Sequence, residues 1–295
     1  GQTVSARTLI VTEPVLALMG PTASGKSALA ERLAETFEGE LISVDSALVY
    51  RGLSIGAAKS DYPHHLVHMR EPDDPYTAAD FATDAKQCID EIRGRGRRPI
   101  LVGGSMLYFR ALIQGLDDIP AIDPTIRADI EAEAQRSSWP ALHQHLSEID
   151  PETAGRLHPN HSQRICRALE VYRGTGTPLS EWQQGNPIPA SEDYECIALC
   201  PEDRAVLHAR IAERLEAMFD AGLVAEVTRL YERESLHTDL PAIRAVGYRQ
   251  VWSYLEGEFD LATCREKVLV ATRQLAKRQL TWLRGWPDLT WIWTD

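Results

Sequence analysis

Hydrophobic residues follow two patterns in the first third of the chain. Short, continuous apolar runs, which are typical of buried strands, occupy Val15–Met19, residues 41–45 and residues 98–104. Between the second and third runs, residues 78–93 place apolar side chains at helical spacing, so that this helix can cover one face of a sheet. Strand and helix signals alternate in this way up to about residue 114, which predicts βαβ units and a parallel sheet.

Strand signals stop after residue 123 and resume only near residue 196. Helical patterns fill the interval and also follow it; they occupy residues 125–135, 139–149, 161–172, 203–221, 224–234 and 260–283. The strand at 196–200 and the Trp-rich end at 286–293, expected as a last strand or a packed extended end, complete the pattern. We therefore predict an α/β fold with a parallel sheet flanked by helices. Residues 13–119 and 190–295 form its core, and residues 120–189 form an inserted, all-helical lobe.

The first strand runs into the octapeptide GPTASGKS, and a helical pattern begins directly after it. This strand–turn–helix context favours a phosphate-binding loop of the GxxxxGK[ST] type. The glycines let backbone N–H groups point inward, Lys26 adds a positive charge, and Ser27 offers a hydroxyl to Mg²⁺. The expected diphosphate site consists of Gly20, Pro21, Thr22, Ala23, Ser24, Gly25, Lys26 and Ser27. The loop alone predicts a bound diphosphate or triphosphate and leaves the reaction open.

The second and third apolar runs each end in polar or small residues. Asp45 closes the second run, and the ligand crevice of an open α/β sheet lies beyond the carboxyl ends of its strands. We therefore expect Asp45 beside the phosphate loop as a base or as an indirect metal ligand; the alternative is a carboxylate that caps a turn or a helix start. The pair Gly103-Gly104 allows either close approach of a ligand or a tight turn into the next helix.

The charge of the chain is −12, which by itself disfavours a nucleic-acid partner. Recognition depends on the local field, however, and the 31 basic residues are not spread evenly. One basic run contains Arg156, Arg164, Arg167 and Arg173, and a second contains Arg273, Lys277, Arg278 and Arg284. Such runs indicate either an RNA-binding stripe or a solvated helix face. Arg210 and Arg214 are neighbours on one helix face, for which surface ion pairing is the simpler explanation.

The five cysteines are scattered and lack the spacing of a zinc site, so we expect reduced core thiols. The histidine groups at 64–68 and 158–161 have no cysteine partners at finger spacing and are expected to be surface or hydrogen-bonding side chains. No apolar stretch is long enough to span a membrane and no secretory signal is present. These features predict a cytoplasmic protein that has no membrane partner.

Five segments together resemble one family, the bacterial tRNA dimethylallyltransferases (tRNA isopentenyltransferases, IPP transferase family). In chain order they are GPTASGKS, SVDSALVYRGLSIGAAK, LVGGSMLYFRAL, QRICRALEVY and IRAVGYRQVWSYLEGE, and the resemblance extends from about residue 16 to residue 283. It departs at Ser105, where the family usually has Thr, and at Ser60, where Pro is common. The resemblance implies transfer of the dimethylallyl group from dimethylallyl diphosphate to the 6-amino group of the adenosine 3′-adjacent to the tRNA anticodon, with release of diphosphate and with Mg²⁺ as cofactor.

The resemblance also implies roles for particular residues. The implied catalytic residues are Asp45, which accepts the proton or a hydrogen bond of the amine, and Thr22 and Arg214, which stabilise the departing diphosphate; Ser27 binds the metal. Arg110 is a weaker candidate for the diphosphate, because of its position after the LVGGS strand end. The implied tRNA contacts are Asp45, Ser46, Ala47, Leu48, Ser105, Arg127, Gln163, Arg164, Ile165, Cys166, Arg167, Arg244, Ala245, Val246, Gly247, Tyr248 and Arg249. For Gln163 the alternative is an ordinary exposed amide, and for Gly247-Tyr248 it is a helix C-cap followed by a core aromatic. We expect a monomer that binds tRNA through its anticodon stem-loop.

Two other functions fit parts of the sequence. A small-molecule kinase of the nucleoside-monophosphate type shares the loop and the parallel sheet, but it leaves the arginine-rich helices unexplained. A non-catalytic RNA-binding module with an inactive loop is disfavoured because Lys26, Ser27 and Asp45 are all present.

Overall fold

The computed structural model describes residues 13–115, 119–183 and 193–295. In this part of the chain, six strands form one parallel sheet in the order β3-β2-β4-β1-β5-β6. The strands are β1 (Val15–Met19), β2 (Gly39–Val44), β3 (His64–His65), β4 (Arg98–Gly103), β5 (Tyr194–Pro201) and β6 (Thr290–Thr294). The predicted α/β class and parallel sheet are confirmed, and the Trp-rich end of the chain is a strand.

Alternate side chains of β1 enter two separate cores, because successive residues of a strand face opposite sides of the sheet. Leu16 and Leu18 belong to the smaller core, with Ala30 and Ala34 of helix α2 (Lys26–Thr36). The opposite face carries the larger core, which is covered by α3 (Ala78–Gly94), α4 (Met106–Ile113) and α14 (Leu261–Arg284). Burial on both faces explains why the central strands are continuously apolar.

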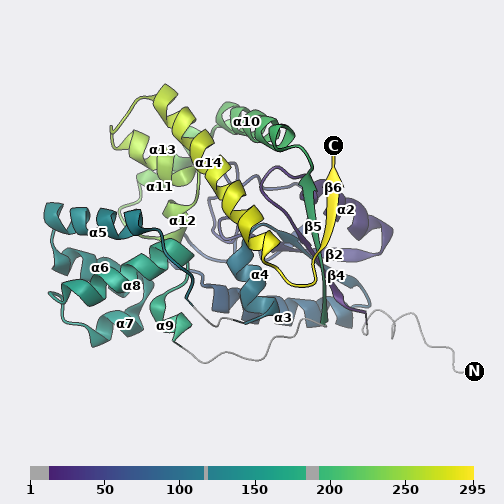
Figure 1. Cartoon of the computed structure of the whole chain (residues 1–295), viewed down its shortest axis with the longest axis horizontal. Coiled ribbons are helices and arrows are strands. Elements are labelled where there is room, and N and C mark those ends of the chain that lie inside the picture. Colours follow the sequence, from purple (N-terminus) through teal and green to yellow (C-terminus); the bar gives the residue numbers. More distant parts are fainter. Residues whose placement is uncertain (1–12, 116–118, 184–192) are drawn as a thin grey trace, which may run out of the picture.

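Helices follow one another between β4 and β5 and gather on the side of the molecule away from β6 (Figure 1). They are α5 (Pro124–Arg136), α6 (Trp139–Ile149), α7 (Pro151–Arg156), α8 (Ser162–Thr175) and α9 (Leu179–Trp182). Within the group, α8 packs against α5, α6 and α9. The predicted helices are therefore present. The second predicted lobe boundary, at residues 189 and 190, lies outside the described residues, so the division into lobes stays a prediction.

Between β5 and α14 lie four more helices, which are α10 (Arg204–Ala221), α11 (Leu223–Tyr231), α12 (Pro241–Arg244) and α13 (Tyr248–Leu255). Gly247 precedes α13 with a φ of 91°, a conformation that favours glycine, so it begins a helix instead of ending one. Tyr248 is fully buried, and its hydroxyl donates a hydrogen bond of 2.6 Å to Glu226 Oε2. The carboxylate of Glu226 also accepts the backbone N–H groups of residues 54–56, so it fixes the loop that follows the Asp45 segment.

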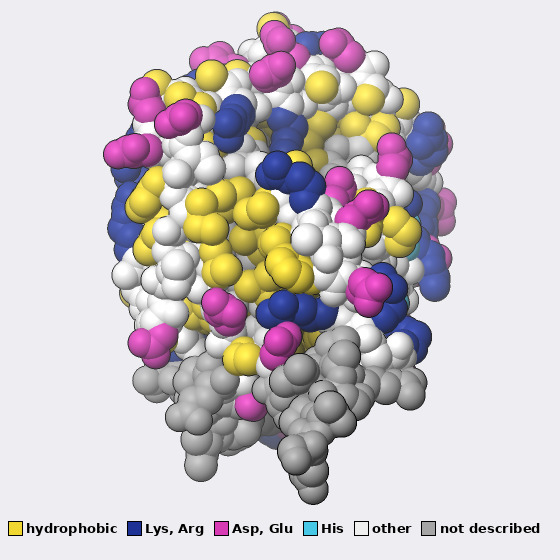
Figure 2. Space-filling model, turned by 90° about the vertical axis from the view of Figure 1, so that its right-hand side faces the viewer, with side chains coloured by type: hydrophobic (Ala, Val, Ile, Leu, Met, Phe, Trp, Pro, Cys, Tyr) yellow, Lys and Arg dark blue, Asp and Glu magenta, His cyan; other side chains and the backbone are white. Residues whose placement is uncertain are grey.

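The edge strand β6 belongs to the face that is turned toward the viewer in Figure 2, where apolar side chains gather in the middle. Ile292 and Trp293 of this strand are 39% and 52% exposed, and the rings of Trp291 and Trp293 stack with centroids 4.6 Å apart.

All five cysteines are buried and unpaired, which agrees with the expected core thiols. Among the described helices, none combines the length and apolar character that crossing a bilayer requires.

Candidate active site

A cavity of about 1310 Å³ lies at the carboxyl ends of β1, β2 and β4. Its lining includes Thr22, Lys26 and Ser27 of the predicted phosphate loop, Asp45 from the end of β2, and Arg214 from α10. This edge is where open α/β sheets hold their ligands. The anion loop and the carboxylate therefore open onto one shared space, although 18 or more positions separate Asp45 from the loop residues in the sequence.

Backbone geometry shapes the phosphate loop. A Cβ atom on Gly20 would lie 2.5 Å from the carbonyl oxygen of Leu199 in β5, so glycine is required where the loop leaves the sheet. Ala23 and Gly25 have positive φ values of 63° and 93°, and Gly25 directly precedes α2. The chain thus turns sharply from a strand into a helix N-terminus, the arrangement that receives anions. Five of the predicted loop residues are absent from the cavity lining; they are Gly20, Pro21, Ala23, Ser24 and Gly25.

The ammonium group of Lys26 is held in the loop by a hydrogen bond of 3.1 Å to the carbonyl oxygen of Pro21. Burial and, to a smaller degree, the positive charge of Arg214 lower the pKa of Lys26 to about 8, while Asp45 acts in the opposite direction. An anion in the loop would favour the charged form of the lysine. The site is therefore prepared for a negatively charged ligand.

Arg214 reaches the loop from α10. Its Nη1 donates a hydrogen bond of 3.3 Å to Thr22 Oγ1, and burial lowers the pKa of the guanidinium. Arg210, one turn earlier, instead donates to the carbonyl oxygens of Ser24 and Asp295, at 3.5 and 3.3 Å. The two arginines that look equivalent in the sequence thus differ, because only Arg214 lines the cavity.

The Asp45 carboxylate caps a turn and also lines the cavity beside the phosphate loop. Its Oδ1 accepts the N–H groups of Ala47 and Leu48 at 2.8 and 3.0 Å, so it caps a turn. The same side chain lines the cavity, and burial raises the pKa of Asp45 against the opposing effects of these N–H groups and of Lys26. A carboxylate that is held in place and whose proton affinity is raised suits proton transfer.

Ser105 and the glycine pair join the ends of β2 and β4. Ser105 Oγ accepts the N–H of Ser46 at 2.8 Å. A Cβ atom on Gly103 would clash with the carbonyl oxygen of Val44 in β2, so this glycine allows the close packing of neighbouring strands. Ser105 itself lines the cavity beside these strand ends.

Gln279 is a site residue that the sequence analysis missed. It is 7% exposed and projects from α14, where its Oε1 accepts the N–H of Thr22 at 3.0 Å and its Nε2 donates to the carbonyl oxygen of Gly104 at 2.9 Å. It therefore connects the phosphate loop to the end of β4. Because 257 positions separate it from Thr22, no local pattern could have indicated this contact.

The cavity is positive although the chain is acidic. Three acids line it, which are Asp45, Asp61 and Asp123, and seven basic residues line it, which are Lys26, Lys59, Arg173, Arg214, Arg244, Arg249 and Arg278. Burial and the charge of Arg173 lower the pKa of Arg244 to about 10, so this arginine remains charged at neutral pH. The local field therefore favours an anionic partner, which the charge of the whole chain does not indicate.

The predicted tRNA contacts fall into three groups. Those that line the cavity are Asp45, Ser46, Ala47, Leu48, Ser105, Arg244, Ala245, Val246 and Arg249. Gln163, Arg164 and Arg167 are exposed on α8, outside the lining, and Arg127 of α5 is half-buried beside Glu170, 2.9 Å from its carboxylate. The side chains of Ile165, Cys166 and Tyr248 are buried, and Gly247 lines a smaller neighbouring cavity.

Three expectations need correction. The side chains of Ile165, Cys166 and Tyr248 pack in the core, so a tRNA contact at these residues would have to be made by the backbone in this structure.

Arg173, expected in a basic stripe, is only 2% exposed and forms ion pairs with Glu133, at 2.8 Å, and with Asp239. Arg110 is absent from the cavity lining; its guanidinium lies over the rings of Trp182 and Trp282.

Two places in the described chain suit a divalent cation. Thr22, Ser27 and Asp45 line the cavity and carry side-chain oxygen atoms, which are the donors that Mg²⁺ prefers. A second group, which consists of His145, His237 and Asp239, brings potential ligand atoms within 4.8 Å of one another. These histidines belong to neither of the histidine groups noted in the sequence.

Comparison with known proteins identifies the family. The IPP transferase family model matches residues 48–286. A curated tRNA dimethylallyltransferase 2 from Hahella chejuensis is 50% identical over 302 residues, covering 96% of this chain and 91% of that protein. A tRNA dimethylallyltransferase from Thiobacillus denitrificans is 55% identical over 280 residues, covering 93% and 90%. The crystal structure of the full-length tRNA isopentenylpyrophosphate transferase from Bacillus halodurans has a TM-score of 0.66 at 37% identity, covering 96% of this chain and 92% of that chain. The chain therefore belongs to the IPP transferase family.

Proposed function

We propose that this protein is an enzyme that transfers the dimethylallyl group from dimethylallyl diphosphate to the 6-amino group of the adenosine 3′-adjacent to the tRNA anticodon. Family membership and the names of the relatives support this activity. The observation that carries the proposal is the single cavity onto which both the phosphate loop and Asp45 open. Its volume of about 1310 Å³ exceeds that of a typical single-ligand pocket, roughly 300–1,000 Å³, and leaves room for two substrates.

In the proposed reaction the allylic carbon–oxygen bond of the donor breaks and a bond forms between that carbon and the adenine nitrogen. Diphosphate leaves with the electron pair of the broken bond, so negative charge grows at the loop. Lys26 and Arg214 are the side chains that stabilise this charge, together with the N–H groups of the loop. The hydroxyl group of Ser27 would hold Mg²⁺, which when bound would neutralise part of the diphosphate charge.

Asp45 is the proposed acceptor of the amine proton. The lone pair of the adenine amine is drawn into the ring, so a base that takes or polarises its proton favours attack. The turn that Ala47 and Leu48 form with Asp45 Oδ1 orients the carboxylate before the substrate arrives. Since Asp45 lies inside a cavity, the nucleotide must leave the stacked anticodon loop to reach it.

The proposed tRNA surface joins the cavity mouth to α8. Arg244 and Arg249 line the cavity, and Gln163, Arg164 and Arg167 are exposed on α8. Unpaired loop bases are the part of an RNA that proteins read most readily, and arginine can pair with both phosphates and base edges. We assign this surface mainly to an inserted lobe at residues 120–189. The proposal includes a cytoplasmic protein that acts as a monomer.

A transfer assay tests the proposal. Purified protein, Mg²⁺ and labelled dimethylallyl diphosphate are incubated with unmodified tRNA transcripts, and the labelled nucleoside is identified after digestion. We expect label in the adenosine 3′-adjacent to the anticodon; no transfer to any adenosine-bearing anticodon stem-loop would refute the activity. A thermal-shift comparison separates the kinase alternative, which predicts stabilisation by ATP and not by dimethylallyl diphosphate.

A further inference from the structure

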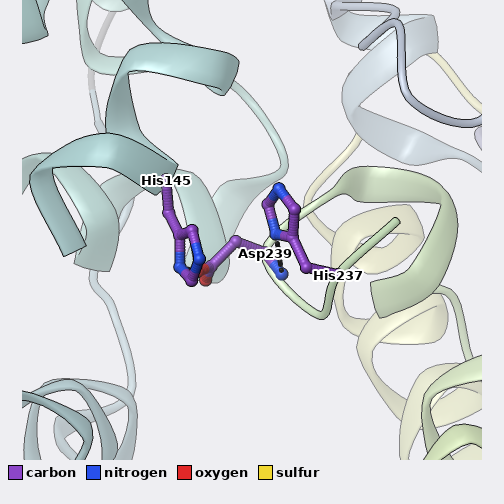
Figure 3. Close-up of side chains that lie close together, drawn as sticks. All are labelled: His145, His237 and Asp239. Atoms are coloured by element: carbon purple, nitrogen blue, oxygen red, sulfur yellow. Dashed lines mark hydrogen bonds and ion pairs between the residues drawn. The ribbon is translucent and has the colours of Figure 1, made fainter. Parts of the chain in front are cut away.

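Two pairs of side chains that can bind a metal ion face each other. One pair comes from α6, and the other comes from the segment at residues 232–240, which leads into α12. His145 and Glu148 come from α6, and His237 and Asp239 come from the segment. Figure 3 shows three of the four, His145, His237 and Asp239, which lie close together. His145 Nδ1 lies 2.5 Å from Asp239 Oδ2, and His237 Nε2 is paired with Glu148 Oε2. The two imidazole rings stack with centroids 4.5 Å apart. Each imidazole therefore contacts a carboxylate from the opposite element.

The spacing within each pair explains why these four groups converge. His145 and Glu148 are three residues apart on a helix, so their side chains lie on the same face. Metal sites in helical bundles use the same spacing, with a carboxylate and an imidazole at positions i and i+3. His237 and Asp239 are two residues apart, and the N–H of Asp239 donates to His237 Nδ1 at 3.3 Å, which brings both side chains into the cluster. Ligand atoms of His145, His237 and Asp239 all lie within 4.8 Å of one another.

We propose that His145, His237 and Asp239, with Glu148 as a fourth ligand, bind one divalent transition-metal ion of the zinc class. Two imidazoles and two carboxylates form a donor set that suits Zn²⁺ and its neighbours in the first transition row. The same donor set is unsuited to Mg²⁺, which prefers oxygen ligands and keeps its own water. The proposed ion is therefore separate from the Mg²⁺ of the reaction.

The two oxygen atoms of Asp239 have different partners. Arg173 contacts Oδ1, which leaves Oδ2 directed toward His145. Imidazole and carboxylate groups bind a metal in their deprotonated forms, so metal binding would leave no proton between His145 Nδ1 and Asp239 Oδ2.

The site would be structural, since four protein ligands close the coordination sphere and leave no position for a substrate. It would join α6 of the helical group to the segment that leads into α12. Arg244, on α12, lines the active-site cavity and donates to the carbonyl oxygen of Thr238, between two of the proposed ligands, at 3.4 Å. Metal binding would therefore fix the arginine-bearing wall of the cavity relative to α6.

Titration calorimetry on the full chain, purified without a histidine tag and treated with a chelator, tests the proposal. The affinities of the chain for Zn²⁺ and Mg²⁺ are compared. Co²⁺ is also added, because its visible absorption spectrum depends on the geometry of its ligands. We expect one Zn²⁺ per chain, no comparable binding of Mg²⁺, and a tetrahedral Co²⁺ spectrum. His145→Ala and His237→Ala should each weaken Zn²⁺ binding at least about tenfold. His161→Ala is the matched control, because His161 is exposed and lies outside the cluster.

Absence of stoichiometric Zn²⁺ binding would overturn the proposal, and so would equal affinity in the His145 and His237 variants and the wild type. Circular dichroism shows whether each variant is folded. If His145→Ala does not fold, His145→Gln replaces it, because glutamine can still donate a hydrogen bond to Asp239 but lacks the imidazole ligand. The readout is metal binding, so the test does not depend on the transferase activity.

Discussion

Asp45→Asn isolates the proposed base with little change in structure. Asparagine keeps the Oδ1 acceptor, so the N–H groups of Ala47 and Leu48 retain their hydrogen bonds of 2.8 and 3.0 Å. The other oxygen becomes an NH₂ group, which cannot accept a proton. The substitution therefore removes the proposed chemistry and preserves the turn that orients the side chain.

The expected loss follows from the role of a general base. Such a group contributes about 10²–10⁴-fold to the rate, or about 3–5 kcal/mol of transition-state free energy. Burial raises the pKa of Asp45, so removing its charge also removes a desolvation cost from the folded state. We therefore expect kcat to fall by at least about 100-fold while the melting temperature changes by no more than about 2–4 °C.

Single-turnover transfer with saturating dimethylallyl diphosphate measures the chemical step directly. Asp74→Asn is the control, because Asp74 is an exposed carboxylate absent from the cavity lining. If Asp45→Asn retained more than about a tenth of the wild-type single-turnover rate, the assignment of Asp45 as base would be wrong. A large loss of the single-turnover rate in Asp74→Asn would show that the assay also responds to substitutions outside the candidate active site.

Three further predictions concern the phosphate loop and the residues that contact it. Arg214→Ala should weaken binding of inorganic diphosphate by about 1.5–3 kcal/mol, because it removes a charged hydrogen-bond donor. Titration calorimetry measures the Kd, and an unchanged Kd would contradict this role of Arg214. Lys26 is charged below its pKa of about 8 and neutral above it, so diphosphate affinity should fall as the pH rises through 8. In Lys26→Met that part of the fall should vanish, and an identical pH profile would exclude Lys26 as its source. Gln279→Leu leaves the N–H of Thr22 and the carbonyl of Gly104 without their partner, so urea unfolding should show a loss of about 1–3 kcal/mol; unchanged stability would argue against this link.

The sheet and most helices were predictable because their signals are local. Continuous apolar runs predicted β1, β2 and β4, and helical spacing predicted α3, since burial against a sheet imposes these patterns on neighbouring residues. The two-residue strand β3 was missed, because its pairing with β2 depends on register and not on its own composition.

Two parts of the candidate site, the phosphate loop and Asp45, had a comparable local signal in the sequence. The phosphate loop and Asp45 both follow strands, and the topology of a parallel sheet brings strand ends together. Gln279 and the buried pairing of Arg173 had no such signal, because their partners lie far away in the sequence. The burial of Tyr248 was open at the level of sequence, since a Gly-Tyr pair fits both a tRNA contact and a helix C-cap followed by a core aromatic; Tyr248 is a core aromatic, but Gly247 begins a helix.

The most direct test of the shared cavity is a crystal structure with an anticodon stem-loop and an unreactive dimethylallyl diphosphate analogue bound together. The diphosphate should lie in the loop at residues 20–27, beside Lys26 and Arg214. The amine of an extruded adenine should lie about 2.6–3.2 Å from the Asp45 carboxylate. An adenine bound outside the cavity, with Asp45 contacting only the N–H groups of its own turn, would contradict the account.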